Sequence, residues 1–203
     1  MYFIGDCHGK FGDLKKICDH LAPGRCIQLG DMGFGFGLDD EFRASPNLSF
    51  LRGNHDNPDV CRRYANYLGD YGFLDDGGVF FVSGAFSIDQ AYRVEGASWW
   101  RDEELSEPQW RKVMELYMDK RPSIVATHDC PHEAYPFLVG PYTGIQANRT
   151  SSALSHMFQL YMPKVWVFAH HHKFKSFAID RTRFVALGEL DVWDSETETR
   201  IAP

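Results

Sequence analysis

The sequence predicts an α/β protein in which parallel strands bring polar side chains to one edge of a sheet. Two observations support this prediction. Short apolar runs with the length of buried strands alternate with runs whose apolar residues recur at helical spacing. Several of these strand-like runs are also followed at once by Asp, Asn or His. Because the carboxyl ends of parallel strands meet at the same sheet edge, we expect these polar side chains to gather there.

The bulk composition fits a single globular domain over residues 1–203. Of these residues, 44% are hydrophobic and 24% are charged, as in ordinary soluble proteins. The net charge of -7 gives no general attraction for a phosphate backbone, so we expect no binding to duplex nucleic acid. A small phosphorylated substrate stays compatible with this charge, because bound metal ions can override it locally.

The cysteines and the first residues predict a cytoplasmic protein. The five cysteines are scattered without Cys-x-x-Cys spacing, which favours reduced thiols over a disulfide framework. The first residues carry no basic segment and turn polar after Ile4, unlike a signal peptide. No apolar run approaches the roughly 18 residues of a membrane-spanning helix, so we expect no membrane association. The sequence indicates no oligomeric state.

The chain opens with a strand, a polar turn and a helix. Residues 2–4 are apolar and lead into a Gly-Asp-Cys-His-Gly turn. Asp6 and His8 lie two apart in this turn, so both face one side of an extended chain. A carboxylate and an imidazole in that arrangement make a pair of metal ligands. Apolar residues at helical spacing then predict a helix over residues 11–21.

The next two apolar runs end in the same way. Residues 25–29 lead into Gly30-Asp31, which repeats the Gly-Asp pair of the first turn. Residues 48–51 lead into Arg52-Gly53-Asn54-His55-Asp56, which places a cation, an amide, an imidazole and a carboxylate around one glycine. Taken alone this stretch is equally well explained by a strand followed by a polar turn. A helix is expected next, over residues 58–68.

The middle of the chain predicts a core strand, an aromatic segment and a helix. Residues 79–86 have the composition of a buried strand. The segment over residues 91–102 contains Trp99 and Trp100, which could wall a pocket; we favour core and covering loop, since aromatic side chains carry much of ordinary core packing. A capping box that begins at Ser106 predicts the following helix.

Two later strands end in histidine. Residues 123–127 lead into His128, for which a surface turn is the alternative explanation. Residues 165–169 lead into three consecutive histidines. Because His170 and His172 are two apart, both can face one site while the histidine between them points away or lies over it.

The remaining elements are a helix, a hairpin and a polar tail. A cap at Thr150 or Ser151 predicts the helix, and Arg149 just before it is a candidate phosphate contact or a solvated surface residue. Residues 175–187 have the pattern of a two-stranded hairpin. The tail from residue 195 is polar and is expected to fray.

Seven potential metal ligands therefore follow five predicted strand ends. They are Asp6, His8, Asp31, Asn54, His128, His170 and His172. This set is larger than one four-coordinate ion needs and suits two ions that share a carboxylate. Buried strand ends have little reason to gather such groups unless they bind something.

In order and spacing, these motifs resemble the five-motif signature of the calcineurin-like metallophosphoesterases, over residues 4–172. The resemblance implies a four-layer α-β-β-α sandwich with two mixed sheets. It also implies a metal-dependent hydrolase with two divalent ions, Mn first, with Fe, Zn or Ni as alternatives. The Arg-Gly-Asn-His-Asp form of the third motif is similar to the branch that contains Ser/Thr protein phosphatases and symmetrical dinucleoside-tetraphosphate hydrolases.

The resemblance further implies roles for individual residues. The first ion would be held by Asp6, His8 and His172, the second by Asn54, His128 and His170, with Asp31 bridging them. Attack by a metal-bridging hydroxide would hydrolyse phosphomonoesters or small phosphodiesters. His55 would donate a proton to the leaving oxygen, Asp56 would orient the His55 ring, and Arg52 would contact the phosphate.

The sequence departs from the family pattern in two places. Where the protein phosphatases have a further Asp and an Arg after the second motif, this chain has Met32-Gly33-Phe34, so their second phosphate-binding Arg is missing. Arg149 is a candidate replacement. Ala169 also stands where the family usually has Gly. The substrate therefore stays open between a small phosphorylated molecule and a phosphoprotein. The alternative function is a non-catalytic scaffold of this fold that binds a protein partner.

Overall fold

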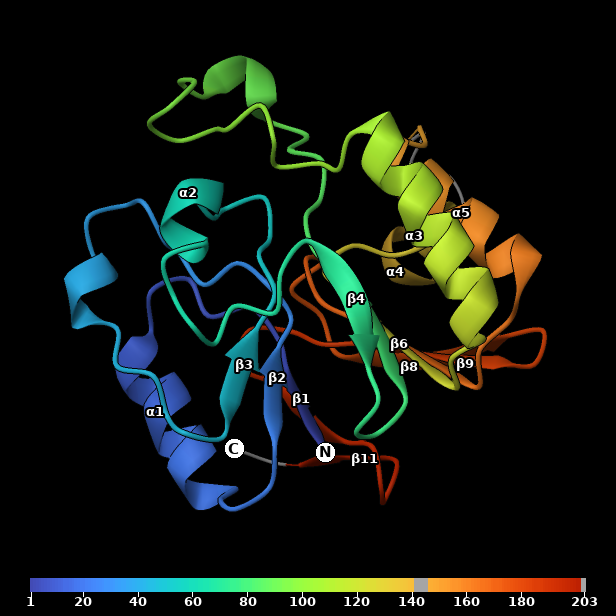
Figure 1. Cartoon of the computed structure of the whole chain (residues 1–203), viewed down its shortest axis with the longest axis horizontal. Coiled ribbons are helices and arrows are strands. Elements are labelled where there is room, and N and C mark those ends of the chain that lie inside the picture. The colour runs from blue at the N-terminus through green and yellow to red at the C-terminus, as the bar shows by residue number, and fades with distance from the viewer. Residues whose placement is uncertain (141–145, 202–203) are drawn as a thin grey trace.

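The structure is a computed structural model that describes residues 1–140 and 146–201 (Figure 1). One sheet contains β1 (Tyr2–Ile4), β2 (Cys26–Gln28), β3 (Leu48–Phe50), β10 (Val192–Asp194) and β11 (Thr199–Ile201). The other contains β4 (Tyr71–Leu74), β5 (Val79–Val82), β6 (Ile124–Thr127), β7 (Val165–Phe168), β8 (Lys175–Ile179) and β9 (Thr182–Ala186). The helices are α1 (Phe11–His20), α2 (Pro58–Cys61), α3 (Glu107–Lys120), α4 (Tyr135–Val139) and α5 (Arg149–Leu160), with 3-10 turns at Asp39–Glu41, Gln90–Tyr92 and His132–Ala134.

Both sheets are mixed, as the resemblance implies. In the first sheet the order is β11-β10-β1-β2-β3, with β1, β2 and β3 parallel and β10 antiparallel to β1. In the second sheet the order is β4-β5-β6-β7-β9-β8. Its four central strands are parallel, and β4 and β8 pair antiparallel at the two edges. The parallel strands carry the segments that build the site.

The alternation of side chains along the strands produces four layers. In β1, Phe3 faces the cluster between the two sheets, and Ile4 faces the cluster under α1. In β5, Phe81 faces the same inter-sheet cluster, and Phe80 faces the helices on the opposite side. Figure 1 shows α1 on one outer face and α3, α4 and α5 on the other. The α-β-β-α sandwich is therefore confirmed.

Most of the predicted elements are present, but two predictions are wrong. The helix expected over residues 58–68 stops at Cys61. The chain then turns back, so that the backbones of Asn66 and Leu68 pair with Phe50 at 3.0 Å each. The tail does not fray within the described residues, because Thr199–Ile201 pairs with β10 as an edge strand. In both places tertiary backbone pairing overrides local preference.

The structure also adds elements that the sequence analysis missed. β10 spans only three residues and β4 is a half-buried edge strand, so neither gives a clear periodic signal. The cap of α5 lies at Asn148, two residues before Thr150, because the Asn148 side chain accepts the backbone N–H of Ser151 at 2.7 Å. No described helix combines the length and the apolar character needed to cross a membrane.

Candidate dinuclear metal site

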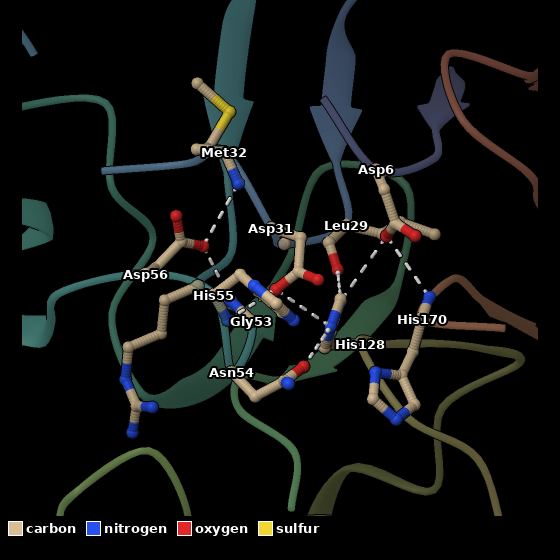
Figure 2. A network of polar contacts seen from close by, with 12 residues as sticks. Asp6, Leu29, Asp31, Met32, Gly53, Asn54, His55, Asp56, His128 and His170 are labelled. Atoms are coloured by element: carbon tan, nitrogen blue, oxygen red, sulfur yellow. Dashed lines mark hydrogen bonds and ion pairs between the residues drawn. The ribbon is translucent and has the colours of Figure 1, made fainter. Parts of the chain in front are cut away.

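The seven candidate ligands meet at the carboxyl ends of the parallel strands, in the arrangement that Figure 2 shows for five of them. They come from five strand exits of both sheets, which places the site across the inter-sheet seam. β1 delivers Asp6 and His8, β2 delivers Asp31, β3 delivers Asn54, β6 delivers His128, and β7 delivers His170 and His172.

The first group of donors consists of Asp6, His8, Asp31 and His172. One ligand atom from each lies within 4.8 Å of those of the others. The Nε2 atoms of His8 and His172 are 3.2 Å apart, and His172 Nε2 is 3.2 Å from Asp6 Oδ2. Two imidazole nitrogens that point at each other this closely are arranged as they would be around a shared cation.

The second group consists of Asp31, His128 and His170, again within 4.8 Å of one another. Asn54 joins it, since its Oδ1 lies 3.3 Å from His128 Nε2. The same imidazole nitrogen lies 3.3 Å from Asp31 Oδ1. Asp31 therefore belongs to both groups, in the position of a bridging ligand. The structure brings the residues together in the same two sets that the family resemblance implies.

Two carboxylate oxygens in this cluster test whether the residues fit a cation. Asp6 Oδ2 and Asp31 Oδ2 are buried and have no hydrogen-bond partner among the described residues. A buried polar atom without a partner is destabilising, and for a charged group the cost is larger still. A cation between these oxygens would satisfy both. The donor set of Asp, Asn and His suits Mn, Fe and Zn alike.

The pKa values in the cluster describe how the protein balances its buried charge. Burial raises the pKa of Asp6 to about 8, with His128 opposing the shift and Asp31 reinforcing it. Burial lowers the pKa of His128, but Asp31 and Asp6 outweigh burial and raise it to about 10. Burial lowers the pKa of His170 to about 3, so this ring is neutral and able to coordinate. Cations would replace the protons on Asp6 and His128.

Contacts outside the cluster fix the orientation of two ligands. His128 Nδ1 lies 2.7 Å from the Leu29 carbonyl, so Nδ1–H donates there and Nε2 faces the other donors (Figure 2). Asn54 Nδ2 donates to Ser87 Oγ at 3.1 Å, which turns its Oδ1 toward the site. These two donors are therefore aimed before any ion binds.

The backbone is strained at several ligand positions. Positive φ angles occur at His8 (47°), Asp31 (56°), His170 (65°) and His172 (52°). Such conformations cost about 1–3 kcal/mol each for ordinary side chains and cluster at functional sites. Glycine provides the necessary space beside them, since a Cβ on Gly53 would lie 2.0 Å from Asp31 Oδ1. The sharp turns explain how the strand exits of the two sheets bring so many donors together.

A cavity of about 650 Å³ opens onto the second group of donors. Its polar wall includes His55, Arg93 and Asn148, and its apolar wall includes Phe86 and Tyr135. The complete lining among the described residues is Asp31, Asn54, His55, Phe86, Ile88, Asp89, Arg93, Tyr135, Val139, Gln146, Asn148, His170, His171 and His172. This volume is in the range of small-molecule sites.

The structure places the two predicted arginines away from this cavity. Arg52 is 1% exposed, and its guanidinium donates to Asp70 Oδ1 at 3.0 Å and to the Glu103 carbonyl at 2.6 Å. Arg149 pairs with Glu104 at 3.0 Å on the surface. Neither side chain lines the cavity, so a direct phosphate contact by either one would require these pairings to break.

His55 and Asp56 are adjacent in the sequence but have different surroundings. His55 lines the cavity, as expected of a proton donor. Asp56 is buried, and its two oxygens accept backbone N–H groups from Gly53 and from residues 32–34, at 2.8–3.1 Å. The predicted role of Asp56 in orienting the His55 ring has no contact to support it. By accepting these hydrogen bonds, the Asp56 carboxylate instead links the segments of the second and third motifs.

Arg93 lines the cavity although the sequence analysis missed it, and His171 lines it in one of the two positions expected for that residue. Arg93 Nη2 lies 2.5 Å from His55 Nε2. His171 lies over the cavity, with Nε2 3.3 Å from the buried Asp129 carboxylate. No motif marks Arg93, which lies in the aromatic segment over residues 91–102. Trp100 of that segment is buried and does not line the cavity, which supports its interpretation as core and covering loop.

Comparisons with known proteins agree with the geometry. The family model for calcineurin-like phosphoesterase matches residues 1–174. No curated protein matches the chain. One solved structure is 12% identical, covers 98% of this chain and 96% of its own, and has a TM-score of 0.57. GAP50, the anchor in the inner membrane complex of Plasmodium, is 8% identical, with 93% and 71% coverage and a TM-score of 0.54.

Phosphopantetheinyl hydrolase from Mycobacterium tuberculosis is also similar, at 14% identity, with 93% and 89% coverage and a TM-score of 0.45. The solved structures with TM-scores above 0.5 support the fold alone. The family model covers all but the last strands of the chain and every candidate ligand. The chain belongs to the calcineurin-like phosphoesterase family and is a metal-dependent hydrolase.

Proposed function

We propose that this protein is a two-metal phosphoesterase that hydrolyses phosphomonoesters or small phosphodiesters in the cavity beside His55. One observation carries the proposal: buried oxygens of Asp6 and Asp31 have no hydrogen-bond partner among the described residues, and Asp31 is shared by two groups of potential metal ligands. Two divalent cations held there would activate a water molecule and neutralise charge on the phosphoryl group, as in other two-metal sites. Mn is our first candidate for both positions, with Fe, Zn or Ni as alternatives.

The protein's own groups supply the remaining chemistry. His55 faces the cavity, where its ring can protonate the leaving oxygen of a bound ester. Burial lowers the pKa of His55, Asp31 opposes this shift, and Arg93 adds to it. A phosphoryl anion beside the ring would favour its protonated form, because an opposite charge stabilises the charged state. The acid would therefore be formed when substrate binds.

The shape of the site favours a small phosphorylated substrate over a phosphoprotein. The cavity of about 650 Å³ is suited to a small organic molecule. It is flanked by the segment over residues 87–103, which supplies Ile88, Asp89 and Arg93 to its wall. A folded phosphoprotein would need an open groove rather than a recess of this kind. The net charge of -7 gives no support for duplex nucleic acid as a substrate.

A non-catalytic scaffold is the weaker candidate. A scaffold that only binds a protein partner has no need for a strained backbone at these positions or for buried carboxylate oxygens without hydrogen-bond partners. We also propose a cytoplasmic location. All five cysteines are free and buried, as expected of a protein from a reducing compartment.

The decisive experiment is to measure hydrolysis of p-nitrophenyl phosphate and its bis-ester by metal-free protein, and again after addition of Mn²⁺, Fe²⁺, Ni²⁺ or Zn²⁺. We expect negligible turnover without metal and recovery with Mn²⁺. Absence of turnover with all four metals would contradict the proposal. Comparison with a cyclic nucleotide, a dinucleoside polyphosphate and a phosphopeptide then defines the substrate class.

A substitution at His55 separates its role from metal binding. We expect His55→Ala to lower kcat by about 100-fold while the metal content stays unchanged, since general acid catalysis typically contributes 10²–10⁴-fold. His156→Ala, on the exposed side of α5, is the matched control and should leave both unchanged. Loss of metal from His55→Ala would show that His55 is not the proton donor but part of the metal site.

A further inference from the structure

The segment over residues 87–103, here called the strap, is tied down at its two ends. It connects β5 to α3 and stands away from both sheets in Figure 1, where it is coloured green. At its ends, the Ser87 backbone N–H and hydroxyl donate to the Glu103 carboxylate at 2.8 and 2.7 Å. Both residues are buried. The strap is therefore a closed loop with a fixed base.

The base of the strap is joined to the metal site. Ser87 Oγ accepts the Asn54 amide N–H at 3.1 Å, so one hydroxyl links the strap to a predicted ligand. Arg52 donates to the Glu103 carbonyl at 2.6 Å on the other side. Because the base is held by buried charge-assisted contacts, the position of the strap relative to the site is set by the fold.

The strap brings Arg93 into the cavity. The Arg93 side chain is 9% exposed, and its Nη2 lies 2.5 Å from His55 Nε2. Its Nε donates to Asp89 Oδ1 at 2.7 Å, and its Nη1 donates to the Ser98 carbonyl at 3.3 Å. Asp89 and Ser98 both belong to the strap, so the strap itself holds the guanidinium beside His55.

The contacts of Arg93 leave some of its N–H groups available to a ligand. A guanidinium has five N–H groups, and the three contacts account for one each on Nε, Nη1 and Nη2. The second N–H on each of Nη1 and Nη2 has no contact of this kind among the described residues. Paired terminal N–H groups match the geometry of a phosphate, which is why arginine is preferred at such sites.

Within the described lining of the cavity, no other long cationic side chain competes for this role. Among the described residues, Arg93 is the only Lys or Arg that lines the cavity, and residues 141–145 and 202–203 contain neither. Arg52 and Arg149 are engaged with Asp70 and Glu104 instead. The cavity therefore has a single arginine, and it comes from a segment outside the motifs that carry the metal ligands.

We propose that Arg93 binds a non-bridging phosphoryl oxygen of the substrate, and that the strap positions it for this purpose. The proposal rests on the proposed phosphoesterase function and names the residue that recognises the phosphoryl group. On substrate binding, the phosphoryl group enters between Arg93 and His55. The arginine exchanges its contact with the His55 ring for one with the phosphate, and the ring becomes available to the leaving oxygen. Asp89 keeps the guanidinium oriented throughout.

The test measures phosphate binding directly. Inorganic phosphate is titrated into Mn²⁺-loaded wild-type protein, Arg93→Gln and Arg93→Lys, with heat and tryptophan fluorescence as readouts. We expect Arg93→Gln to weaken phosphate binding by about 10- to 100-fold, the range for loss of a hydrogen bond to a charged group. Arg93→Lys should recover part of the loss, since it restores charge without the planar fork. Metal content and Tm verify that each variant is folded and loaded.

Arg101→Gln is the matched control. Arg101 lies on the same strap, is 80% exposed and pairs with Glu95 rather than with the cavity. Phosphate affinity and kcat/KM should both stay at the wild-type level in this variant. A loss equal to that of Arg93→Gln would mean that general charge on the strap, and not the Arg93 contact, attracts phosphate, and would overturn the proposal.

Steady-state kinetics distinguish binding from positioning. If Arg93 binds the phosphoryl group, Arg93→Gln raises the dissociation constant of phosphate and lowers kcat/KM together. Unchanged phosphate affinity with a lower kcat would show that Arg93 acts only through His55, which would also overturn the proposal. If wild-type protein hydrolyses no phosphoester but its phosphate binding depends on Arg93, the proposed function fails while the Arg93 assignment stands.

Discussion

The inner and outer donor groups of the metal site are built by different means. The inner group (Asn54, His128 and His170) includes a His128 that is fully buried, whereas the outer group (Asp6, His8 and His172) includes a His172 side chain that is 56% exposed. Leu29 and Ser87 orient the inner donors from outside the cluster, but the closest polar contacts of the His172 ring are with His8 and Asp6, both within the outer group. The inner half is organised by the fold, and the outer half leaves more of its arrangement to the ion.

This difference predicts unequal behaviour of the two ions. Pre-oriented donors lose little freedom on binding, and the groups that orient them typically change metal affinity by 10–100-fold. We therefore expect the inner ion to bind more tightly and to exchange more slowly than the outer one. The following experiments test that expectation, in order of the size of the effect.

Removal of Asp31, the candidate ligand that both groups share, should weaken the binding of both ions. Asp31→Ala takes one donor from each group, so we expect fewer than two ions per chain and a fall in kcat/KM of about 1000-fold or more. Metal analysis of the purified variant and hydrolysis of p-nitrophenyl phosphate measure both effects. Asp180→Ala, in the β8–β9 turn, is the control. Two tightly held ions in Asp31→Ala would rule out a bridging role.

Removal of one imidazole from each donor group should have unequal effects on the stability of the metal-free protein. His128→Ala leaves the Leu29 carbonyl without its buried donor and the neighbouring carboxylates without a compensating charge, so we expect a loss of about 1–3 kcal/mol in the stability of the metal-free protein. His172→Ala removes a half-exposed ring and should change this stability by less than about 0.5 kcal/mol. Denaturant unfolding in the presence of a chelator compares the two, and equal losses would remove the structural distinction.

Metal binding should depend on pH with a definite sign. At pH 7 the raised pKa values of Asp6, about 8, and of His128, about 10, keep both groups protonated in the metal-free protein. Both protons must leave for a cation to bind, so apparent affinity should rise by about tenfold per pH unit for each proton released. Calorimetry in two buffers of different ionisation enthalpy counts the protons. Affinity that is flat between pH 6 and pH 8 would contradict this.

The same pKa shifts make the metal-free protein less stable as pH rises. The pKa of Asp6 is raised from 3.8, so its contribution to stability is complete below about pH 4 and is lost as pH rises through about 8. The increase in Tm on adding Mn²⁺ should therefore grow over this range. In His172→Ala, which keeps the inner group, the growth should continue above pH 8, because the pKa of His128 lies near 10.

The smallest effect should come from a substitution at Ser87, which orients the inner donor Asn54. Ser87→Ala removes the hydroxyl that turns Asn54, so we expect the inner ion to bind about tenfold more weakly while the outer ion is unaffected. Stepwise calorimetric titration with Mn²⁺ separates the two affinities, and Ser152→Ala on the exposed face of α5 is the control. A larger loss of affinity for the outer ion than for the inner ion would contradict the expectation.

The candidate metal ligands were predictable because their signal is local. Each candidate lies within a few residues of the end of a short apolar strand, and parallel strands deliver such residues to the edge of a sheet, so the sequence predicts the candidate donor set. The structure divides these strands between two sheets. The hairpin at β8 and β9 and the helices α1 and α3 are likewise marked by periodicity and caps. Edge strands such as β10 and β11 carry too few residues for a periodic pattern, and their pairing is decided by distant backbone.

The sequence by itself predicted the fold class, the family and the seven candidate ligands, because periodicity, caps and strand-end motifs act over a few residues. Only the tertiary structure decided which arginine reaches the cavity. Arg52 lies inside the motif but is buried against Asp70 and Glu103, whereas Arg93 lies in an unmarked segment and contacts His55. The physical reason is that a side chain's partner in a site depends on how closed loops such as the strap are anchored, and no local pattern encodes that.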